Sequence, residues 1–257
     1  MTMSDSNQPD STEQQPQTGE PILTEKAVRT RRRILEAALA LFARKGYEGT
    51  TMREIAAEAG CSLGLAYRYF AGKDEMVLEL YSELARTLER QVESLPPGTV
   101  AGRFARVMGT LLELMAPHRE TLGALFGAAL NPRSTVGVFG GRASEVRRQA
   151  RGLYYRVVTQ ASDAPRPTQA EDLATLLYGL QLALVLFWLL DRTDGAQRTH
   201  ALLAFLRDIL ARLRPLLALP PVARPLARLT RIVGPLLGDD RYAEPPTGQA
   251  DGSADQE

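Results

Sequence analysis

The feature that most constrains this chain is a pair of short helical patterns joined by a glycine turn, within residues 51–70. Thr51 and Glu54 have the spacing of a capping box, in which each side chain accepts a hydrogen bond from the other residue's amide. Gly60 permits a tight turn, and Ser62 can cap the second helix. A helix, a turn and a second helix form the unit that places one helix in the DNA major groove.

Composition favours an all-helical protein around this unit. The chain has 257 residues, of which 44% are hydrophobic, enough for one large or two modest domains with a core. Stretches rich in Ala, Leu, Arg and Glu dominate, and strand patterns are nearly absent. The single cysteine, Cys61, excludes a disulfide framework, and we expect it to pack as a small apolar residue.

The residues that would support catalysis are scattered. We find no nucleophile beside a base, no cluster with metal-ligand spacing and no glycine-rich phosphate loop. Two separated histidines, His118 and His200, do not form a zinc motif. We therefore expect no catalytic residue, no metal and no cofactor, and an enzyme remains the weaker alternative.

Charge is distributed unevenly along the chain. Residues 26–73 contain ten Lys or Arg against four Glu, a net charge of +6. Residues 198–231 contain seven Arg against one Asp, again +6. Both ends of the chain are acidic. Two basic regions between acidic tails indicate an anionic partner.

The first residues lack the basic start and apolar stretch of a signal peptide. The most apolar run, residues 173–190, is interrupted by Tyr178, Gly179 and Gln181. We interpret it as a buried helix, so we expect no membrane span and a cytoplasmic protein.

The domain organisation follows from composition and helix boundaries. We expect a disordered tail over residues 1–22, a helix-turn-helix domain over 23–72, a larger helical domain over 73–237 and a disordered acidic tail over 238–257. Thr24 is the expected cap of a first helix that ends at Gly46. Glycines and a proline predict a loop at residues 131–141.

At this point the sequence resembles the TetR family of bacterial transcriptional regulators, over about 50 residues from Thr30 to Leu80. The residues that carry the resemblance are Ile34, Ala38, Phe42, Gly46, Tyr47, Thr50, Thr51, Ile55, Ala56, Ala59, Gly60, Ser62, Gly64, Tyr67, Tyr69, Phe70 and Lys73. The rest of the chain is similar only in being helical and apolar. The resemblance implies a small DNA-binding domain, a helical domain for ligand binding and dimerisation, and repression of transcription.

Two sets of residues are candidates for DNA contacts. The candidates for phosphate contacts, which set register without reading sequence, are Thr50, Thr51, Tyr67, Tyr69 and Lys73. A buried Tyr69 and a merely solvated Lys73 are the open alternatives. The candidates for base contacts are Arg53, Ser62, Leu63, Gly64 and Arg68.

We expect Leu63 to contact a thymine methyl group and Leu65 to belong to the core. Two further features have two interpretations each. Gly64, which costs a helix roughly 1 kcal/mol relative to Ala, permits either a close approach to DNA or internal packing. The arginines that open the first helix either touch DNA or form a solvated basic face; they are Arg29, Arg31, Arg32 and Arg33.

In the larger domain we expect a cavity for a small, largely apolar effector, because methionines and aromatic residues recur with few charges. The candidate lining residues are Met108, Leu112, Met115, Phe126, Tyr154, Tyr178 and Trp188. The helices near 168–191 and 195–217 are the candidates for a homodimer contact, because the first is apolar nearly all round.

The basic, amphipathic segment 222–237 either packs on the body as an extra helix, which we prefer, or binds a membrane surface. The function that follows is a ligand-responsive repressor bound to double-stranded operator DNA as a homodimer. An enzyme is the second alternative, and a membrane-associated interaction protein is the third.

Overall fold

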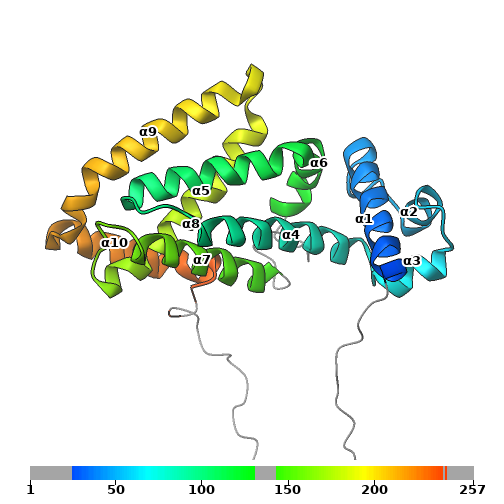
Figure 1. The fold of residues 1–257 in the computed structure, drawn as a ribbon, viewed down its shortest axis with the longest axis horizontal. Helices are drawn as coiled ribbons and strands as arrows, with labels where there is room; N and C mark the ends of the chain where they lie inside the picture. Colours follow the sequence, from blue (N-terminus) through cyan, green and yellow to red (C-terminus); the bar gives the residue numbers. More distant parts are fainter. Residues whose placement is uncertain (1–24, 131–142, 240, 242–257) are drawn as a thin grey trace, which may run out of the picture.

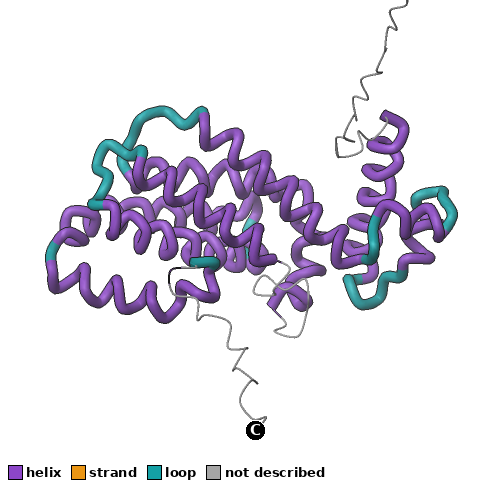
Figure 2. The backbone as a smooth tube through the Cα atoms, turned by 90° about the horizontal axis from the view of Figure 1, so that it is seen from below, coloured by secondary structure: helices purple, strands orange, loops and turns teal. Residues whose placement is uncertain are grey.

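A computed structural model describes residues 25–130, 143–239 and 241. Within these ranges every regular element is a helix, as the composition predicts (Figures 1 and 2). The expected Thr24 cap, the loop at 131–141 and the tail at 1–22 lie outside the described residues. The chain forms a small head of three helices and a larger helical body (Figure 1).

The head packs α1 (Glu25–Lys45), α2 (Met52–Glu58) and α3 (Leu63–Tyr69) around one apolar core. Its fully buried side chains come from all three segments and their junctions; they include Ile34, Phe42, Ile55, Ala66 and Phe70. The predicted capping box of Thr51 and Glu54 is confirmed, and Ser62 caps α3 by accepting from the Leu65 amide at 3.2 Å. Lys45 and Thr51 together lower the pKa of Glu54 to about 2, so its carboxylate stays charged at the start of α2.

The helix α4 (Lys73–Glu93) runs from the head into the body without a break (Figure 1). Its early apolar residues Met76, Val77 and Leu80 are buried. A second contact between head and body comes from α6 (Arg119–Leu130), where the Thr121 hydroxyl donates to the Leu39 carbonyl of α1 at 3.3 Å. The head is therefore held by two body helices.

The body adds α5 (Val100–Met115), α7 (Ser144–Thr159), α8 (Pro167–Leu190), α9 (Gln197–Leu213) and α10 (Pro220–Val233). Short 3-10 turns join several of them, at Ala116–His118, Asp194–Ala196, Arg214–Ala218 and Gly234–Leu237. Arg103 of α5 is buried against α7, where its Nε donates to the Val157 carbonyl at 3.0 Å. Such a buried cation is tolerated because its hydrogen bonds are made.

One described helix, α8, is long and apolar enough to cross a membrane by length and composition. Within the body, α7, α9 and α10 pack against it, and 39% of its most apolar window is buried. The core helix of a soluble protein meets the same criteria, so the helix is weak evidence for a span.

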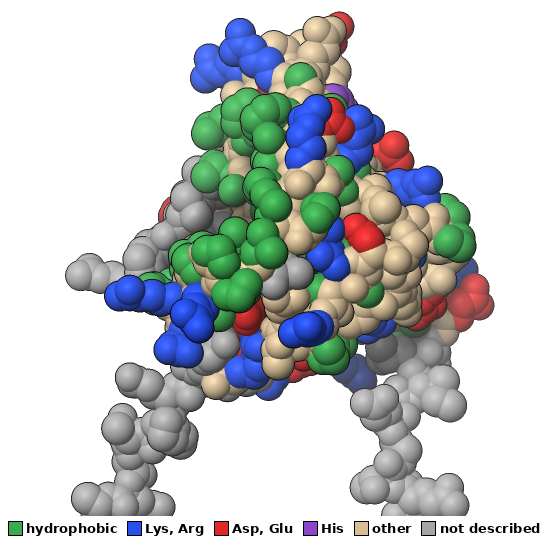
Figure 3. Space-filling model, turned by 90° about the vertical axis from the view of Figure 1, so that its left-hand side faces the viewer, with side chains coloured by type: hydrophobic (Ala, Val, Ile, Leu, Met, Phe, Trp, Pro, Cys, Tyr) green, Lys and Arg blue, Asp and Glu red, His purple; other side chains and the backbone are tan. Residues whose placement is uncertain are grey.

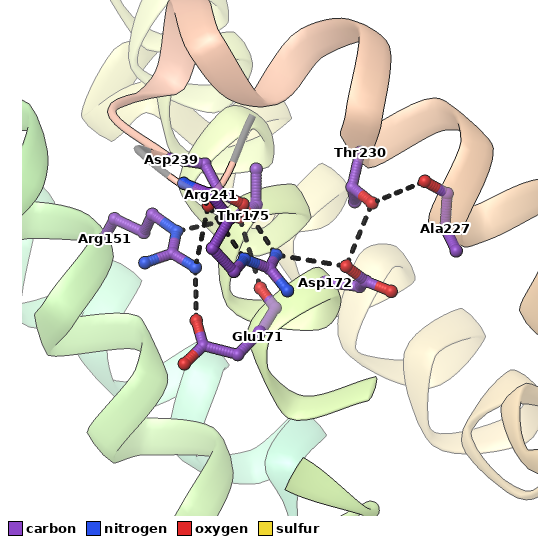
Figure 4. A network of polar contacts seen from close by, with 8 residues as sticks. All are labelled: Arg151, Glu171, Asp172, Thr175, Ala227, Thr230, Asp239 and Arg241. Carbon is purple, nitrogen blue, oxygen red and sulfur yellow. Dashed lines mark hydrogen bonds and ion pairs between the residues drawn. The ribbon is translucent and has the colours of Figure 1, made fainter. Parts of the chain in front are cut away.

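The C-terminal segment departs from the sequence expectation. Composition predicts disorder from residue 238 onward, yet Gly238, Asp239 and Arg241 pack against α7 and α8 (Figure 4). Gly238 has a φ of +76°, and a Cβ there would lie 3.0 Å from the Cβ of Arg147. Glycine is therefore needed for the chain to cross α7 this closely. The packed domain extends at least to Arg241.

Asp239 is the centre of a buried polar network (Figure 4). Its carboxylate accepts from the Thr175 hydroxyl at 2.8 Å and from the Arg241 guanidinium at 2.7 Å, and lies 3.4 Å from Arg151. Arg151 also pairs with Glu171, and Arg241 donates to Asp172 at 3.1 Å. The network ties Asp239 and Arg241 to both α7 and α8.

The same network fixes α10. The Thr230 hydroxyl donates to Asp172 at 3.0 Å, and Thr230 is fully buried. The preferred interpretation of segment 222–237, an extra helix packed on the body, is therefore confirmed, with α10 and the turn Gly234–Leu237 lying against α8.

We predict that Asp239→Ala lowers the free energy of unfolding by about 1–3 kcal/mol, because the buried Thr175 hydroxyl and the guanidinium groups of Arg151 and Arg241 each lose a partner. Chemical denaturation of the full chain measures the change. Asp208→Ala is the matched control, since among the described residues Asp208 pairs with its exposed neighbour Arg207 alone and should change stability by less than about 0.5 kcal/mol. Equal effects of the two substitutions would contradict the network's role.

Candidate DNA interface and effector cavity

The outer surface of the head is formed by α3 and the start of α2. Tyr67 is 51% exposed, and Arg68 beside it is also exposed. Thr51 and Arg53 are exposed at the start of α2, next to a set of backbone amides that the helix leaves without internal partners. This surface offers hydroxyl, guanidinium and amide donors together.

The remaining candidates on α3 differ in exposure. Tyr69 is half-buried and packs against the head core, as does Leu63, while Leu65 is half-buried. Ser62 is exposed but its hydroxyl is engaged as the helix cap. Of the three consecutive candidates Tyr67, Arg68 and Tyr69, the first two are exposed and Tyr69 is exposed only in part.

Gly64 lies on the exposed side of α3. A Cβ built at Gly64 meets no atom within 4 Å, so nothing in the described chain requires a glycine there for packing. Internal packing, one of its two interpretations, therefore lacks support. Its other interpretation, a close approach of the backbone to DNA, stays a prediction.

Thr50 is placed differently from the expectation of a phosphate contact. Its side chain is buried, and its hydroxyl donates to the Gly46 carbonyl at 2.8 Å. Its amide also bonds within the turn, to Tyr47. Thr50 thus holds the turn that leads into Thr51, and it presents no free donor at the surface.

Lys73 is half-buried and already has contacts. Its Nζ donates to the Tyr47 carbonyl at 2.8 Å and lies 4.4 Å from the centre of the Tyr47 ring. The Tyr47 hydroxyl in turn donates to Asp74. These contacts fix the first turn of α4 to the turn between α1 and α2, and a phosphate contact by Lys73 would use the remaining donors of its ammonium group.

Arg31 joins three parts of the head. Its guanidinium lies 3.0 Å from the Glu79 carboxylate on α4 and 4.5 Å from the centre of the Phe70 ring. Arg29 and Arg32 make exposed pairs within α1, and Arg33 is exposed. Arg31 is therefore a structural residue, and the solvated face is formed by the other three.

The body contains a cavity of about 370 Å³ between α4, α7 and α8, with contributions from α5 and α6. Its volume is in the range of small-molecule sites. The lining is mainly aliphatic, and α4 contributes Leu84, Ala85 and Leu88 to it. One helix, α4, therefore contacts the head at its start and the cavity along its middle.

Two of the seven predicted lining residues, Met115 and Tyr178, lie on the cavity wall. The prediction is wrong for four others, Met108, Leu112, Tyr154 and Trp188, which are buried in the core. The Tyr154 hydroxyl donates to Gln181 at 2.7 Å and contacts the Met108 sulfur at 3.3 Å, which turns both inward. The Trp188 ring packs under the Arg119 guanidinium. The side chain of Phe126 lies outside the described part of the structure.

Sequence reasoning missed five polar residues of the wall, which are Tyr81, Glu89, Arg147, Gln149 and Gln181. Burial raises the pKa of both Tyr81 and Tyr178 to about 12, and the charge of Arg147 opposes this effect at Tyr178. Tyr81 lies four residues after Val77 and three before Leu84, so the apolar face of α4 was the available signal for Tyr81. The sequence carries no such signal for Arg147, because an arginine in a basic helix is expected to be solvated.

Comparison with known proteins relates both parts of the chain to one family. Residues 34–80 match the family model described as bacterial regulatory proteins, tetR family. Residues 103–213 match the model described as tetracyclin repressor-like, C-terminal domain.

Curated relatives match over part of their length. The HTH-type transcriptional repressor KstR of Rhodococcus jostii is 44% identical over 84 residues, which is 31% of this chain and 38% of that protein. The HTH-type transcriptional regulator BetI of Brucella canis is 38% identical over 96 residues, 37% of this chain and 48% of that protein. The matches thus span less than half of the relatives' length.

Solved structures share the fold. A putative TetR-family regulator from Syntrophomonas wolfei aligns with a TM-score of 0.59 and 19% identity, covering 72% of this chain and 95% of that one. FadR of Bacillus subtilis, described in complex with stearoyl-CoA, aligns with a TM-score of 0.53 and 17% identity, covering 68% and 96%.

We predict that Glu79→Gln lowers the free energy of unfolding by about 1 kcal/mol at pH 7, because it weakens the half-buried pair with Arg31. Burial alone raises the pKa of Glu79, but the hydrogen bonds and charges of Arg31 and Arg86 lower it below 4.5. The contribution of this pair is therefore complete above pH 4.5 and is lost as the pH falls through the lowered pKa.

Urea unfolding at pH 7 and at pH 3 measures both effects, and the gap between wild type and Glu79→Gln should narrow at pH 3. Glu83→Gln, an exposed glutamate of the same helix, is the control and should change little at either pH. A gap that matches the control, or that does not depend on pH, would contradict the assignment.

Proposed function

The chain belongs to the TetR family of bacterial regulatory proteins, and we propose that it is a repressor that a small, largely apolar effector releases from operator DNA. The observation that carries this proposal is the exposed donor surface of α3 and α2 on a head that one continuous helix joins to an apolar cavity. The functions of the curated relatives, which are transcriptional regulators and repressors, agree with it.

In the proposed complex α3 enters the major groove. Tyr67 donates to a phosphate, supported by Thr51 and the amides at the start of α2, and these contacts fix position without reading sequence. Arg68 and Arg53 reach base edges, since a guanidinium can donate two hydrogen bonds to guanine. Gly64 lets the backbone of α3 approach the groove closely.

A homodimer is needed to place two such helices on one duplex. A two-fold dimer that binds two half-sites sets them about 34–36 Å apart. Exposed apolar residues on α8 and α9 support a contact there, since Leu190 is 66% and Phe205 59% exposed. Figure 3 shows hydrophobic side chains gathered on the end of the molecule where α9 leads towards α10. Contiguous apolar surface of this kind marks interaction sites.

Release requires that the effector bind the two conformations of the protein with different affinity. An occupant of the cavity contacts Leu84, Ala85 and Leu88 of α4, and the first turn of α4 is fixed to the head through Lys73 and Asp74. A tilt of α4 would then change the spacing of the two heads. By linkage, the operator weakens effector binding by the same factor.

The alternatives have less support. Within the described residues no group of three or more His, Cys, Asp or Glu is placed to hold a metal ion. The membrane alternative for segment 222–237 loses its basis in part, because α10 is packed on α8.

We predict that Arg68→Ala weakens binding to the operator by about 1–3 kcal/mol and to random duplex by much less, because its contact reads a base. Tyr67→Phe should weaken both by a similar factor, because its contact is to phosphate. Fluorescence anisotropy with tiled duplexes from DNA beside the chain's own coding sequence, at one fixed salt concentration, measures both.

Tyr155→Phe on α7 makes the same chemical change far from the head and should leave every affinity unchanged. The proposal is contradicted if wild type binds every tile as weakly as random duplex. It is also contradicted, as to the role of Arg68, if Arg68→Ala affects operator and random duplex alike.

A further inference from the structure

The polar groups of the cavity wall carry more information about the ligand than its aliphatic lining does. Those groups are Tyr81, Glu89, Arg147, Gln149, Tyr178 and Gln181. In an otherwise apolar site, a few such groups fix the orientation of a ligand and select its head group.

The acceptors of this set already have partners. The Glu89 carboxylate pairs with Arg156, and the Gln181 carbonyl oxygen accepts from the Tyr154 hydroxyl at 2.7 Å. The Gln149 amide points to Glu145, to which it donates at 3.2 Å. A ligand that brings donors to the cavity would therefore find few acceptors.

Two hydroxyl groups of the wall, in contrast, have no hydrogen-bond partner among the described residues. Neither Tyr81 nor Tyr178 has a hydrogen-bond partner in the part of the chain that the structure describes, although Tyr178 is 3% exposed. Their pKa values, raised by burial to about 12, keep both protonated at neutral pH, so both are donors. Both tyrosines line the cavity, so an acceptor group on a bound ligand can take a hydrogen bond from either hydroxyl.

Arg147 adds a positive charge at the same end as Tyr178. It is buried and lines the cavity, and its charge acts on the Tyr178 hydroxyl. The C-terminal segment packs beside these two residues, since Gly238 crosses against Arg147 and Leu237 lies against Gly179, which follows Tyr178 on α8.

We propose that the cavity binds an amphiphile with one apolar chain or ring system and one carboxylate, which the Tyr178 hydroxyl and Arg147 hold. This inference rests on the proposed function, because it names the chemical class of the effector. A neutral hydrocarbon would leave the tyrosine donors without partners, and a cationic amphiphile would be repelled by Arg147.

Isothermal titration calorimetry of the full chain, without DNA, compares three probes of equal chain length: decanoate, decanol and decylammonium. We expect decanoate to bind about tenfold more tightly than decanol, in line with hydrogen bonds to a charged group, and decylammonium to bind most weakly. Equal affinities, a preference for the cation, or no binding of decanoate would overturn the proposal.

Variants locate the head group. Tyr178→Phe should remove most of the preference for decanoate over decanol and leave decanol affinity within about twofold, because only the hydroxyl is lost. Tyr155→Phe, outside the cavity, should keep the preference. Arg147→Gln is a second variant. It is judged by the same ratio of decanoate affinity to decanol affinity, which a general loss of affinity leaves unchanged. An unchanged ratio in both cavity variants would overturn the assignment.

The two levels of the proposal fail separately. If decanoate is preferred but no tile of DNA binds more tightly than random duplex, the repressor function is wrong and the ligand class stands. If a tile binds selectively but decanoate is not preferred, the ligand class is wrong and the repressor function stands.

Discussion

The structure depends on α4 remaining one continuous helix from the head to the cavity. Its first two turns are fixed to the head by Lys73 against Tyr47 and by Glu79 against Arg31, and its middle forms a wall of the cavity. A helix transmits a tilt along its length because its hydrogen bonds hold successive turns together. A ligand that tilts α4 from within the cavity would therefore also move the head.

The opposite wall of the cavity is stabilised by Gly238 and Asp239. Asp239 joins α7 and α8 through Arg151 and Thr175, and Gly238 crosses directly against α7. This buried network makes the α7–α8 wall a fixed surface, because opening it would leave charged groups without partners. An occupant of the cavity would then displace α4 more readily than α7 or α8.

The sequence predicted what local chemistry determines. The capping box, the Ser62 cap and the exposed Tyr67 follow from residues within one turn of each other. It could not predict the cavity wall, because lining depends on how distant helices cross: the Tyr154 hydroxyl on α7 donates a hydrogen bond to Gln181 on α8, and Tyr154 therefore lies in the core. It also predicted disorder at Asp239, whose buried partner Thr175 lies 64 residues away. Composition holds no information about such a partner.

The claim that the cavity and the DNA-binding head are coupled through α4 has a direct test. Ala150 on α7 lines the cavity, so Ala150→Trp fills it with a side chain that stands in for an effector. The affinity of this variant for the operator duplex, measured by anisotropy alongside its thermal stability, is the decisive quantity. We predict a loss of about tenfold with the fold retained, within the range of allosteric coupling. Wild-type operator affinity in a stable, cavity-filled variant would contradict the coupling.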